Sequence, residues 1–220
     1  LYLAIKYKLS KEIIELLITE NNKDIQTESG NTPLQFAIRN KLSEEIIKLL
    51  ITDKNKDIQT ESETRYGYTP LHDAIEYKLS DEIIKLLITD KNKDIQTEYG
   101  QTPLYLAIEE KLSKEIIELL ITENNKDIQT ESGYTPLHLA IEYNLSKEII
   151  KLLITKKNKN IKTETGDTPL HYAIAYKLSD EIIELLITNY NKSISNTKGY
   201  IPHRCAIKYK LSEKIIEKLR

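Results

Sequence analysis

Apolar and polar positions along the chain recur in blocks, and each block begins with a glycine and a proline at fixed spacing. The six prolines lie 37, 33, 33, 33 and 33 residues apart, and a glycine stands three positions before each of them. After each proline, apolar residues recur at helical spacing, as in Leu137, Ala140 and Ile141, and a second apolar stripe follows, as in Ile149 to Ile154. Each block therefore predicts two short helices followed by a loop.

The predicted helix starts carry specific signals. Thr135 suits an N-cap position, and Pro136 suits the first helical position, where a missing N–H has no cost. The first helix is expected to end near Asn144, and Ser146 is expected to cap the second helix. Alanine occupies one slot of the first helix in every block, which predicts close approach between helices.

Two short antiparallel helices cannot bury their apolar faces alone, so the blocks must stack. We predict one array over residues 1–220, with the first and last units incomplete. A chain that starts at Leu1 is expected to be a fragment or a processed form. Lys214 and Lys218 replace the usual Glu and Leu, as in a polar cap, so the array is expected to end near Arg220. The approximate units are 1–26, 27–63, 64–96, 97–129, 130–162, 163–195 and 196–220.

The pattern Gly-x-Thr-Pro-Leu-His-x-Ala, at 133–140, 166–173 and closely at 67–74, resembles the ankyrin repeat. The resemblance covers the whole chain. It implies an all-α ankyrin-repeat solenoid of about seven helix-turn-helix units with short β-hairpin-like fingers. It also implies a non-catalytic protein–protein interaction scaffold that grips a partner on its concave face. One departure is the turn between the helices, where Lys78-Leu79-Ser80 or Asn144-Leu145-Ser146 replaces the usual Gly-His.

Composition narrows the function classes. The formal net charge is −2, which argues against a nucleic-acid binder. No apolar run is long enough to insert into a membrane. The single cysteine favours an intracellular and cytoplasmic location, while a disulfide-free secreted protein and nuclear or host-cell delivery stay open. We expect no cofactor, no metal and no small-molecule substrate.

Histidine and cysteine are the remaining candidates for chemistry. His72, His138 and His171 share one slot of different units, and repeats that pack like helices are too far apart for two of them to share a metal. The resemblance instead implies a structural hydrogen-bonding role near the helix start. Cys205 lies two residues from His203, but a small buried side chain is favoured over a nucleophile.

Variation between otherwise similar units concentrates in a few slots. One slot lies two residues before each Pro, and two others lie six and seven residues after it. Tyrosine fills eight of these positions, which is typical of protein interfaces, although the tyrosine seven residues after Pro could instead fill space at the end of the first helix. We call these residues the variable face: Lys6, Tyr7, Asn31, Arg39, Asn40, Tyr68, Glu76, Tyr77, Gln101, Glu109, Glu110, Tyr134, Glu142, Tyr143, Asp167, Ala175, Tyr176, Tyr200, Lys208 and Tyr209.

Glutamates in the central units predict an acidic part of this face that prefers a basic patch or peptide, although a merely solvated face would look similar. Four extra residues, Glu63 to Tyr66, lengthen one finger, either to touch a partner or as a neutral extension. Two other functions stay open: the targeting arm of a larger enzyme or ligase adaptor, and a structural spacer. The predicted partner-binding residues are Arg39, Tyr66, Tyr68, Glu76, Tyr77, Glu109, Glu110, Tyr134, Glu142, Tyr143, Tyr176 and Tyr200.

Overall fold

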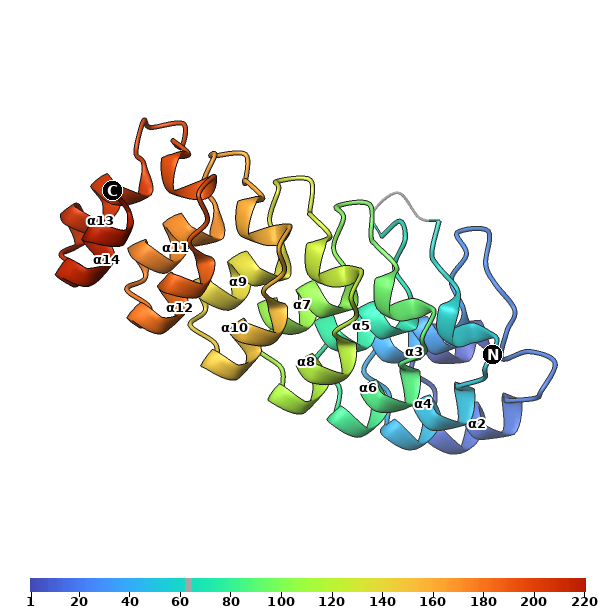
Figure 1. Cartoon of the computed structure of the whole chain (residues 1–220). Helices are drawn as coiled ribbons and strands as arrows, with labels where there is room; N and C mark the ends of the chain where they lie inside the picture. The colour runs from blue at the N-terminus through green and yellow to red at the C-terminus, as the bar shows by residue number, and fades with distance from the viewer. Residues whose placement is uncertain (62–64) are drawn as a thin grey trace. The chain divides into compact units, whose positions relative to one another are not determined.

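A computed structural model describes residues 1–61 and 65–220, and these residues fold into paired helices (Figure 1). The first helices of the pairs are α1 (Tyr2–Lys6), α3 (Pro33–Arg39), α5 (Pro70–Glu76), α7 (Pro103–Glu109), α9 (Pro136–Glu142), α11 (Pro169–Ala175) and α13 (Pro202–Tyr209). The second helices are α2 (Lys11–Leu17), α4 (Glu44–Leu50), α6 (Asp81–Leu87), α8 (Lys114–Leu120), α10 (Lys147–Leu153), α12 (Asp180–Leu186) and α14 (Glu213–Lys218).

A single 3₁₀ turn stands in the loop between many of the pairs: η1 (Asn55–Asp57), η2 (Asn92–Asp94), η3 (Asn125–Asp127), η4 (Asn158–Asn160) and η5 (Asn191–Ser193). The part of the chain that the structure describes contains no strand, which confirms the all-α fold class. Within the same residues, no helix has both the length and the apolar character needed to cross a bilayer.

The helices group into two compact units. Unit 1 is Leu1–Leu120 and unit 2 is Ile121–Arg220. Inside each unit, first helices pack against first helices of the next repeat, α3 and α7 on α5 in unit 1, and α9 and α13 on α11 in unit 2. The alanine slot lies fully buried, as at Ala74 and Ala173, which confirms its predicted role in close packing. The single array over residues 1–220 stays a prediction.

The predicted caps are formed. In α5, the backbone N–H of His72 donates to Oγ1 of Thr69 (3.4 Å), and the backbone N–H of Thr69 donates to Nδ1 of His72 (3.2 Å). Gln35 takes the place of the histidine in α3, where its Oε1 accepts from the backbone N–H of Thr32 (3.0 Å). This reciprocal arrangement satisfies two amide groups that a helix start otherwise leaves unpaired.

The turn between the two helices keeps the conformation that glycine usually supplies. Lys78 has φ 54° and Asn144 has φ 50°, both in the left-handed region. The backbone N–H of Lys78 donates to the carbonyl of Ile75 (3.0 Å), and that of Leu79 donates to the carbonyl of Ala74 (3.0 Å). These two hydrogen bonds form a Schellman motif. The motif holds a residue that has a Cβ in the left-handed conformation, which is unfavourable for such residues.

The fingers are turns, because each is closed by only a few backbone hydrogen bonds. In one of them, the backbone N–H of Thr130 donates to the carbonyl of Tyr134 (2.9 Å). Gly133 has φ 80°, and a Cβ at this position would lie 2.7 Å from the carbonyl oxygen of Lys162. Glycine is therefore required here both by conformation and by the close approach of the next finger.

A row of buried asparagines joins the loops of neighbouring repeats, a feature that the sequence pattern shows but that we did not predict. Asn158 donates from Nδ2 to the carbonyls of Leu153 (2.7 Å) and Lys126 (3.1 Å), and its Oδ1 accepts from the backbone N–H of Thr155 (2.9 Å). Asparagine recurs with full burial at Asn55, Asn92, Asn125 and Asn191. Each such side chain satisfies backbone groups of loops that would otherwise be buried without partners.

Candidate functional site

The predicted partner-binding residues fall into both units and differ in exposure. Tyr66, Tyr176 and Tyr200 are exposed, with 57%, 47% and 38% of their surface accessible. Tyr68 is buried, with 8% accessible. The others are half-buried: Arg39, Glu76, Tyr77, Glu109 and Glu110 in unit 1, and Tyr134, Glu142 and Tyr143 in unit 2.

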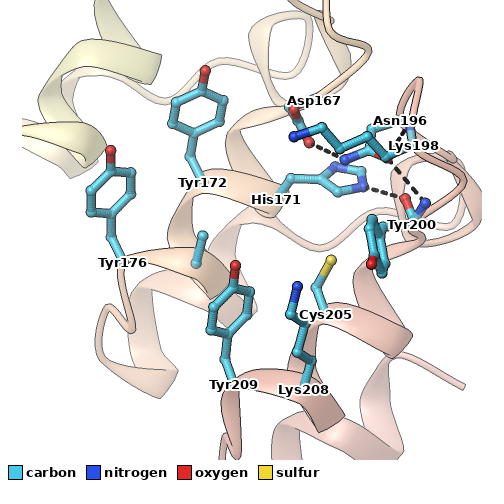
Figure 2. A pocket seen from close by; sticks show the side chains of 11 residues that line it. Asp167, His171, Tyr172, Tyr176, Asn196, Lys198, Tyr200, Cys205, Lys208 and Tyr209 are labelled. Carbon is cyan, nitrogen blue, oxygen red and sulfur yellow. Dashed lines mark hydrogen bonds between the residues drawn. The ribbon is translucent and has the colours of Figure 1, made fainter.

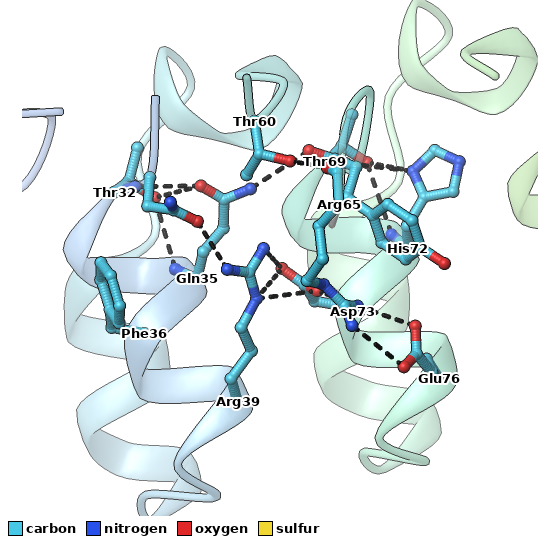
Figure 3. Close-up of polar contacts among 12 residues, drawn as sticks. Thr32, Gln35, Phe36, Arg39, Thr60, Arg65, Thr69, His72, Asp73 and Glu76 are labelled. Atoms are coloured by element: carbon cyan, nitrogen blue, oxygen red, sulfur yellow. Dashed lines mark hydrogen bonds and ion pairs between the residues drawn. The ribbon is translucent and has the colours of Figure 1, made fainter. Parts of the chain in front are cut away.

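In unit 1, part of the variable face is occupied by an internal network of charges (Figure 3). The centre of this network is the carboxylate of Asp73 in α5, which is fully buried. Nε of Arg39 donates to both carboxylate oxygens at 3.0 Å. Nη2 of Arg65, from the lengthened finger, donates to Oδ1 at 2.7 Å. Two guanidinium groups from different repeats thus compensate one buried carboxylate.

Arg65 also engages the neighbouring members of the face. Its guanidinium donates to the two oxygens of Glu76 at 3.1 and 2.7 Å and lies 4.1 Å from the centre of the Tyr68 ring. Burial, together with the charge of Glu76, raises the pKa of Tyr68 to about 12. Arg65 therefore covers Tyr68, while Tyr66 points into solvent. Glu63 and Thr64 lie outside the described residues.

Asp73 occupies a slot that is apolar or uncharged elsewhere. The other occupants are Leu3, Phe36, Leu106, Leu139, Tyr172 and Cys205. A carboxylate in this slot would be unstable alone, because burying an unpaired charge is costly. Complete burial raises the pKa of Asp73, and the guanidinium groups of Arg39 and Arg65 oppose this shift. An acid in an apolar slot, close to an insertion that carries arginine, was the sequence signal for this network, and we did not predict it.

The rest of the face in unit 1 keeps an acidic character. Burial raises the pKa of Glu109, and the nearby charges of Glu110 and Glu76 raise it further. Glu110 lies 2.9 Å from Nζ of Lys78. Glu109 thus combines partial burial with like-charged neighbours, an arrangement that a cation would relieve.

In unit 2, the variable face is aromatic. The hydroxyl of Tyr172 donates to the hydroxyl of Tyr134 (2.6 Å), and their rings meet edge to face at 5.9 Å. Tyr176 stacks on Tyr172 with ring centres 6.2 Å apart. Burial raises the pKa of Tyr172, and the hydrogen bond to Tyr134 adds to the shift. Tyr172 lies outside the predicted slots but joins two predicted tyrosines into one cluster.

A cavity of about 230 Å³ opens in unit 2 among α11, α13 and the finger that precedes α13 (Figure 2). Two predicted residues, Tyr176 and Tyr200, line it, as do Lys208 and Tyr209 of the variable face. His171 also lines the cavity, and its Nε2 is 3.2 Å from the carbonyl oxygen of Tyr200. The remaining lining residues are Asp167, Tyr172, Ala175, Asn196, Lys198 and Cys205. We refer to this cavity as the tyrosine pocket.

The histidines act in helix capping, as the resemblance implied. Because Nδ1 of His72 and of His138 accepts a backbone N–H, each neutral ring carries its proton on Nε2. Burial lowers the pKa of both histidines to about 4. Cys205 is buried, and burial raises the pKa of its thiol, in line with the predicted small buried side chain. Among the described residues, no group of three or more His, Cys, Asp or Glu could hold a metal ion.

Comparison with known proteins agrees with the geometry. A family model described as ankyrin repeats (3 copies) matches residues 1–99, 79–164, 112–198 and 144–219. Among solved structures, the ankyrin repeat domain of Bcl-3, described as a unique member of the IkappaB protein family, matches with a TM-score of 0.65 and 23% identity. That match covers 100% of this chain and 96% of the other, and it supports the fold alone. No curated protein matches the sequence. Since the family model covers nearly the whole chain, the protein belongs to the ankyrin repeat family.

Proposed function

We propose that this protein is a non-catalytic recognition scaffold that binds a protein partner through its variable face, on the side that ankyrin similarity predicts to be concave. Ankyrin repeats are in general protein–protein interaction modules. The observation that carries the proposal is the tyrosine pocket, because Tyr176 and Tyr200 come from different repeats and line one cavity. A cavity with several aromatic walls suits an anchor side chain of a partner.

The contrast between buried and exposed positions supports the same function. The paired isoleucines of the second helices are largely buried and barely change between repeats, as at Ile83 and Ile84. By contrast, Tyr176 and Tyr200 in unit 2 are exposed to solvent. Tyrosine offers a large amphipathic contact at low entropic cost, so its presence there favours recognition over a purely structural spacer.

Charge suggests the partner's chemistry at unit 1. Glu109 is half-buried beside Glu76 and Glu110, and we propose that this part of the face contacts a basic patch or peptide. Coulombic attraction would mainly raise the association rate and favour partners of the right sign. A location inside the cell and the absence of a cofactor, a nucleic-acid partner and a small-molecule substrate stay predictions.

The test is affinity capture from the source cells with the tagged protein, followed by calorimetry with the purified partner. The test variant carries Tyr176→Ser and Tyr200→Ser. The matched control is Tyr190→Ser, because Tyr190 is 60% exposed and lies in the same unit but outside the variable face. We expect the test variant to lose affinity by about 10-fold or more, as for aromatic anchors, while the control binds normally. Equal binding by both variants would contradict the proposal.

A further inference from the structure

The tyrosine pocket differs in the sign of its charge from the equivalent positions of α5 and α7 in unit 1. The slot six residues after Pro holds Glu76 and Glu109 in these two helices, and it holds Lys208 at the pocket. Basic residues, Lys6 and Arg39, occupy the slot in the first two repeats of unit 1. A second lysine, Lys198, lies on the finger that forms another wall. We propose that the tyrosine pocket binds a carboxylate group of the protein partner, with Lys208 as the main charged contact. This inference rests on the proposed function and adds the chemistry of the group that the pocket takes.

Lys208 is positioned by aromatic rings rather than by an acid. Its Nζ lies 4.8 Å from the centre of the Tyr200 ring and 5.6 Å from that of the Tyr209 ring. No ion pair of Lys208 is found within the described residues. Arg65, in contrast, forms ion pairs with Asp73 and Glu76. A cation held against aromatic faces keeps its charge available for an anion, since the rings do not neutralise it.

The one acid that lines the pocket is already engaged by neutral groups. Asp167 accepts from Nδ2 of Asn196 (2.8 Å) and from Oγ1 of Thr165 (2.8 Å). Asn196 also accepts the backbone N–H groups of Lys198 (3.1 Å) and Tyr200 (3.0 Å), so the finger is shaped before any ligand arrives. Asp167 thus serves to shape the wall of the pocket.

Charge balance and lining favour a carboxylate over a phosphate. Two lysines against one aspartate leave the pocket with one net positive charge, and burial keeps His171 neutral by lowering its pKa. Arginine, the side chain best suited to bidentate phosphate binding, is absent from the lining. The tyrosine rings provide apolar walls for the methylene groups of a glutamate, and the hydroxyls of Tyr200 and Tyr209 are the candidate donors, since the hydroxyl of Tyr172 already donates to Tyr134. A group with a single negative charge and a short apolar stem matches these features.

The experiment is an NMR titration of protein labelled with ¹³C-tyrosine, following the ring signals of Tyr176, Tyr200 and Tyr209. Three peptides serve as probes. The first is acetyl-Ala-Ala-Glu-Ala-Ala-amide, the second carries Gln in place of Glu, and the third carries Gln with a free carboxyl terminus. We expect the first or the third peptide to shift these signals, which also distinguishes a side-chain carboxylate from a terminal one. The neutral amide should leave the signals unchanged.

Two variants with the same change of charge make the test specific. Lys208→Met removes the proposed contact, and Lys177→Met removes an exposed lysine at the end of α11 outside the pocket. We expect Lys208→Met to weaken binding about 10-fold, the loss typical of one charge-assisted hydrogen bond, and Lys177→Met to bind normally. Unchanged binding by Lys208→Met, or the absence of shifts with both carboxylate peptides, would overturn the inference. Equal shifts with the neutral amide would also overturn it but would leave the proposed function standing.

Discussion

The same two slots of the repeat produce opposite surfaces in the two units. In unit 1, Asp73 and Glu76 bind Arg65 from the chain's own finger, and Tyr68 is covered as a result. In the last repeat of unit 2, the corresponding slots hold Cys205 and Lys208, and a cavity of about 230 Å³ stays open beside them. The backbone of the repeat is alike in both places, so a few side chains decide whether this face serves internal contacts or is available to a ligand.

The longer finger of unit 1 supplies a cation that the buried carboxylate of Asp73 needs. The finger before α5 is four residues longer than the others, and Arg65 lies within that addition. A carboxylate in the apolar slot of α5 needs cations within hydrogen-bond distance, and the preceding repeat alone supplies only Arg39. The longer finger supplies the second cation. In unit 2 the slot is uncharged, and the finger of normal length leaves space instead of filling it.

The largest expected effect comes from breaking the network in unit 1. Replacing both Arg39 and Arg65 by Met should lower the free energy of unfolding by about 4 kcal/mol, because Asp73 would be buried without a partner. Adding Asp73→Leu to the double arginine variant, which copies Leu106 of the next repeat, replaces the whole network by apolar side chains and should bring that free energy back to within about 1 kcal/mol of the wild type. Urea denaturation of the three proteins measures both values. A cost for the triple variant as large as that of the double arginine variant would show that the network itself stabilises the unit.

Acid should act on both units through the capping histidines. The pKa of His72 and of His138 is about 4 in the folded protein, below the ordinary value of 6.5. As the pH falls, these histidines therefore bind protons in the unfolded chain before they do so in the folded protein. The contribution of the neutral histidines to the free energy of unfolding is complete above pH 6.5 and is lost as the pH falls toward 4. The loss amounts to about 3 kcal/mol for each histidine.

Gln35 provides a replacement for these histidines that does not titrate, because it already makes the same capping box in α3. The double variant His72→Gln and His138→Gln should match the wild type at pH 7.5 and exceed it in stability at pH 4.5. Urea midpoints at the two pH values test this. A parallel loss of stability in both proteins would mean that other groups cause the acid sensitivity.

The buried asparagines should matter equally in the two units. Asn92→Ala in unit 1 and Asn158→Ala in unit 2 each leave buried backbone groups without partners, at a cost of about 2–3 kcal/mol. Hydrogen exchange of the adjacent loops should accelerate in both variants. A clear difference between the two sites would show that the units differ in their scaffold as well as in their surface.

The smallest effect concerns the turns with positive φ. Lys78→Gly in unit 1 and Lys177→Gly in unit 2 remove the strain of a Cβ in the left-handed region, which costs about 1 kcal/mol, and the greater chain entropy of glycine offsets part of this. We expect the free energy of unfolding of each variant, measured by thermal unfolding, to increase by about 0.5 kcal/mol. Lys78→Gly also removes the ion pair with Glu110, an exposed contact that contributes less than about 1 kcal/mol, so Lys177→Gly is the cleaner test of turn strain. A loss of stability in Lys177→Gly would contradict the expected gain.

The helices were predictable because their signals are local. Thr69 and Pro70 mark a helix start within two residues, and the stripe from Ile83 to Leu87 marks a buried face. The left-handed turn at Lys78 was harder to predict, because the sequence has no glycine there to indicate it. The row of buried asparagines was visible as a repeat of Asn every 33 residues between central units, and only its role needed the structure.

The positions of the candidate site could be named from the sequence, but the contacts that their side chains make could not, and partner binding at these positions stays a prediction. The choice of Tyr176 and Tyr200 rested on variation between repeats, and the structure brings both to one cavity. The burial of Tyr68 depends on a side chain from an insertion that folds back over it, which no local pattern encodes. Lys208 occupies the same position of the repeat as Glu76, six residues after Pro. Whether its charge is available to a ligand depends on the aromatic rings around it, which the sequence does not show.

The most direct test of this comparison is the accessibility of the tyrosines, measured by nitration with tetranitromethane and peptide mass spectrometry at neutral pH. We predict modification of Tyr200 and, more slowly, of Tyr176 in unit 2, because burial and the charge of Glu142 raise the pKa of Tyr176. We predict protection of Tyr68 in unit 1, because Tyr68 is buried under Arg65 and has a raised pKa. In the variant Arg65→Ala, Tyr68 should become reactive while Tyr176 and Tyr200 react as before. Modification of Tyr68 in the wild type at the rate of Tyr200 would contradict the account.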